Sequence, residues 1–217
     1  MNNFKIDIVS DVVCPWCIVG YLKLSQAIEI LNNDSTVDVS FDISWHPFEL
    51  APDLSVQGEN LREFLAKKYG SSPAAGEQAR NQLTDIAKQL GFDFNFTPEM
   101  QRYNTFKAHQ LIFWAKQKAL QTPLKLALFK SYFTDNLNIT DNQVLSSIAE
   151  SVGLDSGEAL SVLENETFAQ QVRASQQQWI QQGINSVPSV ILQEKYLIPG
   201  ALESQAWVDT IKQVINE

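Results

Sequence analysis

The tetrapeptide Cys14-Pro15-Trp16-Cys17 constrains this chain more than any other feature, because it holds both of the chain's cysteines. It follows an apolar segment, residues 4–9, that predicts a short strand, and it opens a helical pattern over about residues 15–31. A disulfide across so small a loop adds little stability, because the entropy that it removes from the unfolded chain falls as the loop shortens. The pair is therefore better explained by reactivity than by cross-linking.

The start of a helix favours ionisation of a thiol, because unpaired backbone N–H groups and the positive end of the helix dipole face it. Pro15 suits the first helical position, where its missing N–H is not needed. We therefore expect Cys14 to be an exposed, acidic thiol that attacks substrates. Cys17 begins an apolar stripe, and we expect it to be the sheltered, resolving thiol. The stripe continues through Tyr21, Leu24, Ile28 and Leu31.

Length, composition and charge limit the class of protein. The 217 residues, 44% of them hydrophobic, suffice for one large domain or two small ones. A net charge of -9 argues against nucleic acid or an anionic membrane as partner and favours a protein or small-molecule substrate. The first residues do not resemble a secretion signal, and no apolar run is long enough to span a membrane. We expect a cytoplasmic location, where a lone cysteine pair is catalytic, sensing or metal-binding.

Periodicity divides the rest of the chain into three parts. Alternating apolar residues predict an edge strand over residues 37–45. A long helical stretch follows, with a strand signal returning at residues 187–192 and 196–198 as a hairpin and a last helix at about 204–215. The helices of the middle stretch are expected at 60–69, 74–90, 99–118, 124–134, 142–152 and 168–182, with an extra turn near Ala159.

These elements predict an α/β fold in which a long all-helical insertion separates an N-terminal β-α-β unit from a C-terminal β-β-α unit. The α/β domain is discontinuous and comprises residues 1–57 and 184–217. The helical insertion domain comprises residues 58–183.

Three segments carry a family resemblance: residues 9–17 with the cysteine pair, residues 45–53 with the sequence WHPFELAPD, and residues 108–111 with the sequence AHQL. Together with the Val-Pro that enters the hairpin, they resemble the DsbA family of the thioredoxin fold, and within it the FrnE-like cytoplasmic branch. Near relatives of that branch are the 2-hydroxychromene-2-carboxylate isomerases and the kappa-class glutathione transferases. The resemblance extends over essentially the whole chain.

The resemblance implies a thiol-disulfide oxidoreductase in which Cys14 attacks and Cys17 resolves. It also implies a cis proline, Pro188, beside the pair and at the border of the substrate groove, where the backbone of Val187 would pair with an extended substrate. Two departures matter. The further C-terminal cysteines of some FrnE-like proteins are absent here. The Pro-Trp dipeptide differs from that of thioredoxin and of DsbA, so neither reduction potential can be transferred.

Three further polar residues are candidates for the site. His46 follows the edge strand, and either lines the groove or is an ordinary loop histidine. His109 lies in a helix near apolar residues, which favours a packing role. Asp11 either tunes the thiol or satisfies the turn. A zinc site would need both histidines, and because they have no short His-x-His spacing we predict no metal.

The function that these residues predict is a cytoplasmic dithiol-disulfide oxidoreductase that needs neither metal nor nicotinamide. A reducing cytosol favours reductase or isomerase duty, while glutathione stays open as a co-substrate. Two alternatives remain: a glutathione-dependent isomerase or transferase, which needs one nucleophile only, and a holdase that binds unfolded chains in an apolar cleft. The sequence does not predict the substrate, the potential or the oligomeric state.

Overall fold

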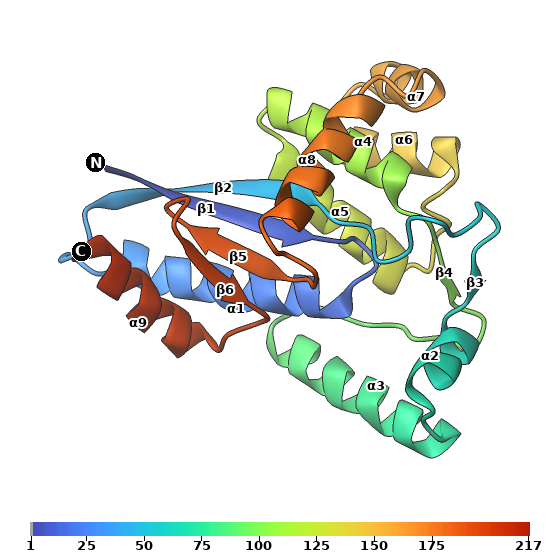
Figure 1. Ribbon diagram of the computed structural model, residues 1–217, viewed down its shortest axis with the longest axis horizontal. Helices are drawn as coiled ribbons and strands as arrows, with labels where there is room; N and C mark the ends of the chain where they lie inside the picture. The colour runs from blue at the N-terminus through green and yellow to red at the C-terminus, as the bar shows by residue number, and fades with distance from the viewer. Residues whose placement is uncertain (1) are drawn as a thin grey trace.

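A four-stranded sheet forms the centre of the computed structural model, which describes residues 2–217 (Figure 1). The central strand β1 (Asn2–Ser10) pairs in parallel with β2 (Val39–Pro47) and antiparallel with β5 (Ser189–Leu192). The strand β6 (Tyr196–Pro199) completes the sheet, whose order is β2-β1-β5-β6. The residues predicted as an edge strand therefore do lie at an edge.

Alternation along the strands separates two apolar layers. Ile8 of β1 and Val190 of β5 face the main core, which they share with helix α1 (Pro15–Asn32) and helix α9 (Ser204–Ile215). These two helices pack side by side, as Figure 1 shows. Val9 and Ile191 face the other way, into a smaller cluster that Trp179 covers. Both faces of the sheet are thus buried where β1 pairs with β5, which explains the consecutive apolar residues Ile8-Val9 and Val190-Ile191 there.

The segment between β2 and β5 is mainly helical, as predicted. Its helices are α2 (Leu61–Tyr69), α3 (Pro73–Gln89), α4 (Phe106–Gln117), α5 (Gln121–Phe133), α6 (Asn142–Ser151), α7 (Ser156–Glu164) and α8 (Ala169–Gln181). The extra turn expected near Ala159 is the full helix α7, whose first turn the Asp155 carboxylate caps by accepting from the Glu158 N–H.

The helix expected over residues 99–118 is wrong in its first turns. Residues 101–102 form a short strand, β4 (Gln101–Arg102), that pairs antiparallel with β3 (Glu59–Asn60). An ion pair of 3.0 Å between Arg102 and Glu59 fixes this pairing, and the helix α4 begins only at Phe106. The pair Thr97-Pro98, a sequence typical of a helix start, therefore precedes a turn instead.

The insertion packs on the edge of the sheet through α4, α5 and α8, all of which contact β2. None of the described helices is long and apolar enough to cross a membrane. The predicted α/β fold with a helical insertion between its two halves is confirmed.

Candidate active site

The cysteine pair lies where β1 turns into α1. Cys14 is the N-cap residue of the helix and Pro15 its first residue, so the chain enters the helix without losing a backbone hydrogen bond. Both cysteines are free thiols, and their side chains lie 3.5 Å apart. The turn is closed by the Cys14 N–H, which donates to the Asp11 carbonyl at 3.3 Å. This spacing lets the two sulfurs form a disulfide with a small movement.

Cys14 is less exposed than the sequence suggested. Only 6% of Cys14 is accessible and none of Cys17, while Trp16, between them, is 46% exposed. The expectation of an exposed Cys14 is therefore wrong, and its side chain contacts Cys17 and the Val187 carbonyl of the loop before β5. Cys17 is sheltered as expected. Trp16 is the most exposed residue of the tetrapeptide, so a partner that reaches Cys14 would contact its indole ring.

The loop before β5 borders Cys14. The Val187–Pro188 peptide bond is cis, and the Val187 carbonyl accepts a hydrogen bond of 3.6 Å from the Cys14 Sγ. The Pro188 carbonyl accepts from the Gly200 N–H at 2.8 Å, which ties the loop to the end of β6. Gly20 of α1 permits this close approach, since a Cβ there would lie 3.3 Å from the Pro188 ring. The structure thus brings Val187 and Pro188 beside the cysteines.

The two thiols are unequal acids. A hydrogen bond to Cys17, together with burial, raises the pKa of Cys14 well above its ordinary value. Burial also raises the pKa of the Cys17 thiol, but the side chains of Cys14 and Ser10, followed by the positive charge of Lys125, outweigh it and lower that pKa overall. The Val187 carbonyl adds to this difference, because it accepts from a thiol and repels a thiolate. The expectation of an acidic Cys14 is therefore wrong for the reduced pair.

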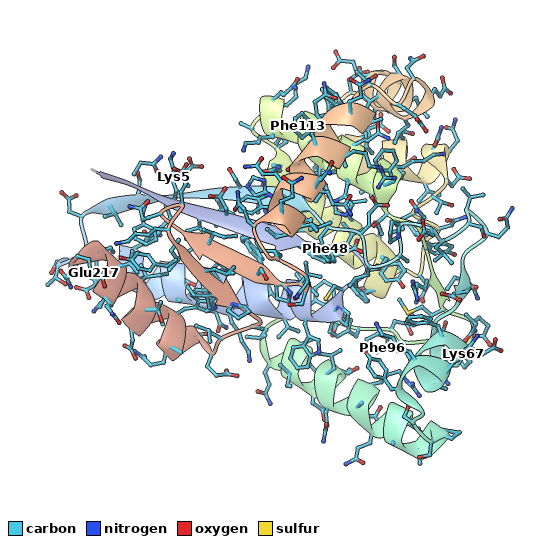
Figure 2. All side chains as sticks on the ribbon, in the orientation of Figure 1. Lys5, Phe48, Lys67, Phe96, Phe113 and Glu217 are labelled. Atoms are coloured by element: carbon cyan, nitrogen blue, oxygen red, sulfur yellow. The ribbon has the colours of Figure 1, made fainter. Side chains whose placement is uncertain are left out.

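Asp11 and His109 meet beneath the cysteine turn, and both are almost fully buried. The His109 Nε2 lies 3.4 Å from an Asp11 carboxylate oxygen and 3.1 Å from the Phe48 carbonyl. The other Asp11 oxygen accepts from the Leu50 N–H at 2.7 Å. Burial raises the pKa of Asp11, but His109 and this backbone N–H outweigh it and lower the pKa, so Asp11 is an anion. Figure 2 shows Phe48 near the middle of the molecule, where β1 ends and β5 begins.

Lys125 is a cation that sequence reasoning missed. It lies on α5, is 1% exposed, and its Nζ is 3.5 Å from the Ser10 carbonyl. The rings of Trp45 and Phe129 lie 5.4 and 5.0 Å from the same nitrogen. Burial lowers the pKa of Lys125 to about 8, against the opposing effect of Cys17, Asp11 and Cys14. A signal was present, because Lys125 is four residues before Phe129 and four after Gln121, on the buried stripe of the helix.

Glu49 and Arg173 form a second missed pair. The Glu49 side chain is fully buried and its carboxylate accepts from Arg173 of α8, whose guanidinium lies 3.8 Å from the Phe106 ring centre. Burial raises the pKa of Glu49, opposed by His109 and Arg173. The insertion thus supplies the basic side chains His109, Lys125 and Arg173, and the segments that follow β1 and β2 supply Asp11 and Glu49.

His46 is not part of this cluster. Its Nε2 pairs with the Asp7 carboxylate at 2.7 Å, and its ring packs edge-on against Trp179 with centres 4.8 Å apart. Within residues 2–217, no group of three or more histidine, cysteine, aspartate or glutamate side chains could hold a metal ion. The chemistry available at the site is therefore that of two adjacent thiols, one buried lysine and a buried Asp–His pair.

Comparison with known proteins agrees with this geometry. Residues 5–212 match the model of the DSBA-like thioredoxin domain. The uncharacterized protein YwbO of Bacillus subtilis is 28% identical over 98% of this chain and 96% of its own length. A probable DsbA oxidoreductase from Streptomyces coelicolor superposes with a TM-score of 0.90 at 26% identity, over 99% of this chain and 91% of its own.

A cytosolic disulfide reductase, DsbM from Pseudomonas aeruginosa, whose structure contains glutathione, superposes with a TM-score of 0.64 at 14% identity, over 98% of this chain and 100% of its own. This second likeness concerns the fold alone. The family match covers nearly the whole chain, and its segment includes the cysteine pair and the cis-proline loop. The chain belongs to the DSBA-like thioredoxin domain family, whose members are thiol-disulfide oxidoreductases and related isomerases.

Proposed function

We propose that this protein is a dithiol-disulfide oxidoreductase in which Cys14 attacks a substrate disulfide and Cys17 releases the product. The observation that carries the proposal is the placement of two free thiols 3.5 Å apart at a helix start, with the more accessible sulfur against the Val187 carbonyl. An extended substrate laid along residue 187 would pair with its backbone and present a sulfur to Cys14.

The reaction proceeds by two exchanges. The Cys14 sulfur attacks one sulfur of the substrate, the substrate S–S bond breaks, and one half departs as a thiolate. The Cys17 sulfur then attacks Cys14, the mixed disulfide breaks, and the second half departs. The substrate gains two electrons and the enzyme holds a Cys14–Cys17 disulfide, which an external thiol reduces again.

Glutathione is the external thiol that we propose. The DsbM structure, which shares this fold, contains it, and a free cysteine pair matches the dithiol form that a glutathione pool would maintain. We further propose membership of the FrnE-like branch, on the resemblance carried by residues 9–17, 45–53 and 108–111. We also propose a cytoplasmic location, because proteins of oxidising compartments use cysteines for cross-links, whereas the two cysteines here form one reactive pair.

Reduction of insulin with glutathione as reductant tests the proposal. The Cys17→Ser variant should lose about a hundredfold or more in turnover and accumulate a mixed disulfide on Cys14, visible by mass spectrometry. The Cys14→Ser variant should form no such adduct. A Ser151→Ala variant, changed far from the pair, is the matched control. If Cys17→Ser turned over glutathione-dependent isomerisation as fast as the parent chain and neither reduced insulin, the one-nucleophile alternative would replace our proposal.

A further inference from the structure

The segment of residues 48–52, which follows β2, contains no helix or strand but is fixed along its length. The His109 Nε2 lies 3.1 Å from its first carbonyl, and the Leu50 N–H donates to the Asp11 carboxylate at 2.7 Å. The Asn104 side chain donates to the last two carbonyls of the segment, at 3.4 and 3.0 Å. An irregular segment held this closely presents its exposed side chains in one fixed position, as binding loops do.

Glu49, within this segment, is a buried acid that two residues of α8 hold. Its side chain has no accessible surface, and one carboxylate oxygen accepts from Arg173. In the amide orientation that satisfies both groups, Gln176 donates to the same oxygen at 2.9 Å and accepts from the Glu49 N–H at 3.2 Å. The half-exposed Arg173 guanidinium also stacks on the Phe106 ring of α4. We call this arrangement of Glu49, Arg173 and Gln176 the Glu49 clasp.

The Glu49 clasp determines where Leu50 lies. A buried ion pair contributes little net stability compared with apolar side chains of the same size, whereas its hydrogen bonds are directional. Glu49 is held in the interior, and the side chain of the next residue, Leu50, is 44% exposed. The Leu50 N–H is bonded to Asp11, whose carbonyl accepts from the Cys14 N–H. The clasp therefore sets the position of an exposed leucine relative to the cysteine turn.

We propose that Leu50 is a specificity-determining residue that contacts the substrate beside its disulfide, and that Arg173 and Glu49 are positioning residues that act through it. Trp16, two residues after Cys14, adds a second exposed apolar side chain. The substrate class that fits these contacts is a polypeptide with apolar residues next to its disulfide, because the charged ends of glutathione lose water there without an apolar contact in return. The inference rests on the proposed function, since it names the substrate of the same sulfur.

Two cyclic peptides test the role of Leu50, identical except that leucine or serine stands next to each cysteine of the disulfide. With glutathione as reductant, Leu50→Ser should raise the KM for the leucine peptide about fivefold to tenfold and leave kcat unchanged, since the lost apolar contact is made equally in the ground and transition states. The KM for the serine peptide should change by less than about twofold. Leu137→Ser, at an exposed leucine in the loop after α5, is the matched control and should change neither KM.

Substitutions of Arg173 test the positioning role. Arg173→Met keeps the bulk of the side chain but breaks the clasp, and should raise the KM for the leucine peptide as much as Leu50→Ser does. Arg173→Lys, which can still pair with Glu49, should recover most of that loss. In the double variant the two changes should not add, because Arg173 acts through Leu50. An equal loss for both peptides, or additive effects, would indicate general damage to the fold and overturn the positioning role.

Binding separates this inference from the proposed function. The Cys14→Ser/Cys17→Ser variant cannot react, and its affinity for the labelled leucine peptide, measured by fluorescence anisotropy, should fall about fivefold to tenfold on Leu50→Ser. Binding that depends on Leu50 while the parent chain fails to reduce insulin would reject the proposed function alone. Binding and KM that are both unchanged by Leu50→Ser overturn the inference, even if Arg173→Met does not fold.

Discussion

Cys14 and Cys17 differ in the two properties that a nucleophile needs, access and ionisation. Cys14 retains a small exposed area but keeps its proton, whereas Cys17 ionises more readily but has no accessible surface. The proton can cross the 3.5 Å between them, so the pair titrates as one system and its first ionisation serves both sulfurs. Reactivity toward a bulky reagent is then decided by access.

Alkylation of the reduced protein with iodoacetamide should therefore modify Cys14 first. We expect complete labelling of Cys14 near neutral pH before Cys17 reacts measurably, because Cys17 lies under Cys14 and the helix. Peptide mass spectrometry after timed quenching measures the order. In urea both cysteines should react at similar rates, which controls for local sequence. Faster labelling of Cys17 in the folded protein would reverse our assignment of the attacking sulfur.

The reactive pair could be predicted from sequence because Cys14 and Cys17 lie within four consecutive residues. The position of Val187-Pro188 beside them could be predicted because the family resemblance includes this dipeptide. The acidity of the pair could not. It depends on Lys125, more than a hundred positions downstream, and on how completely the fold desolvates both sulfurs. His109 was interpreted as a packing residue for the same reason, since only the fold brings Asp11 to it.

The helix α5 is attached to the sheet by a buried polar side chain, Gln121, at the outer edge of β2. Gln121 accepts from the Trp45 N–H and donates to the Trp45 carbonyl, both at 2.9 Å. The Trp45 indole also donates to the Thr122 hydroxyl at 2.9 Å. β2 is an edge strand, and these bonds satisfy backbone groups that would otherwise be buried without a partner.

The Gln121→Ala variant should accordingly lose about 2–4 kcal/mol of unfolding free energy, because it leaves one buried N–H and one buried C=O unpaired. Urea denaturation followed by circular dichroism measures this loss. Gln117→Ala, at an exposed position of α4, is the matched control and should change stability by less than about 0.5 kcal/mol. Equal effects of the two substitutions would show that water replaces the Gln121 contacts.

Most helices and strands could be predicted from local sequence signals, and residues 99–105 are the exception. Capping residues such as Asp141 and Asp155 marked real helix starts, since their carboxylates accept from the first helical N–H groups. Residues 99–105 have a helical sequence pattern, but they form no helix and contain the short strand β4, because pairing with β3 and the contact of Arg102 with the Phe64 ring outweigh local preference. Such short strand pairings join segments that are distant in the sequence, and two-residue strands are too short to show an alternating apolar pattern.

At the scale of the molecule, the sheet and the insertion share one apolar core. Residues of β1 and α1, such as Ile6 and Leu24, belong to the same cluster as Leu111 of α4 and Leu128 of α5. The aromatic residues of the insertion are divided, since Phe94, Phe96 and Phe133 pack together while Phe113 packs with Phe168. Figure 2 shows Phe96 and Phe113 on opposite sides of the molecule.

A shared core predicts that the whole chain unfolds in one cooperative transition, because neither part can expose its apolar face alone. Two probes distinguish the parts in the reduced Cys14→Ser variant. Far-UV circular dichroism reports mainly the insertion helices, and reaction of Cys17 with a thiol reagent reports the opening of the sheet around α1. Their midpoints in urea should coincide.

Separate midpoints would contradict this prediction. Loss of helical signal at lower urea, while Cys17 stays protected, would mean that the insertion unfolds by itself and that the cluster through Leu111 and Leu128 contributes little across the boundary. Coincident midpoints would mean that the site cannot lose Lys125 without losing the fold. Lys125 of α5 would then stay beside the cysteine turn for as long as the chain is folded, so the electrostatics of the site would depend on the stability of the whole molecule.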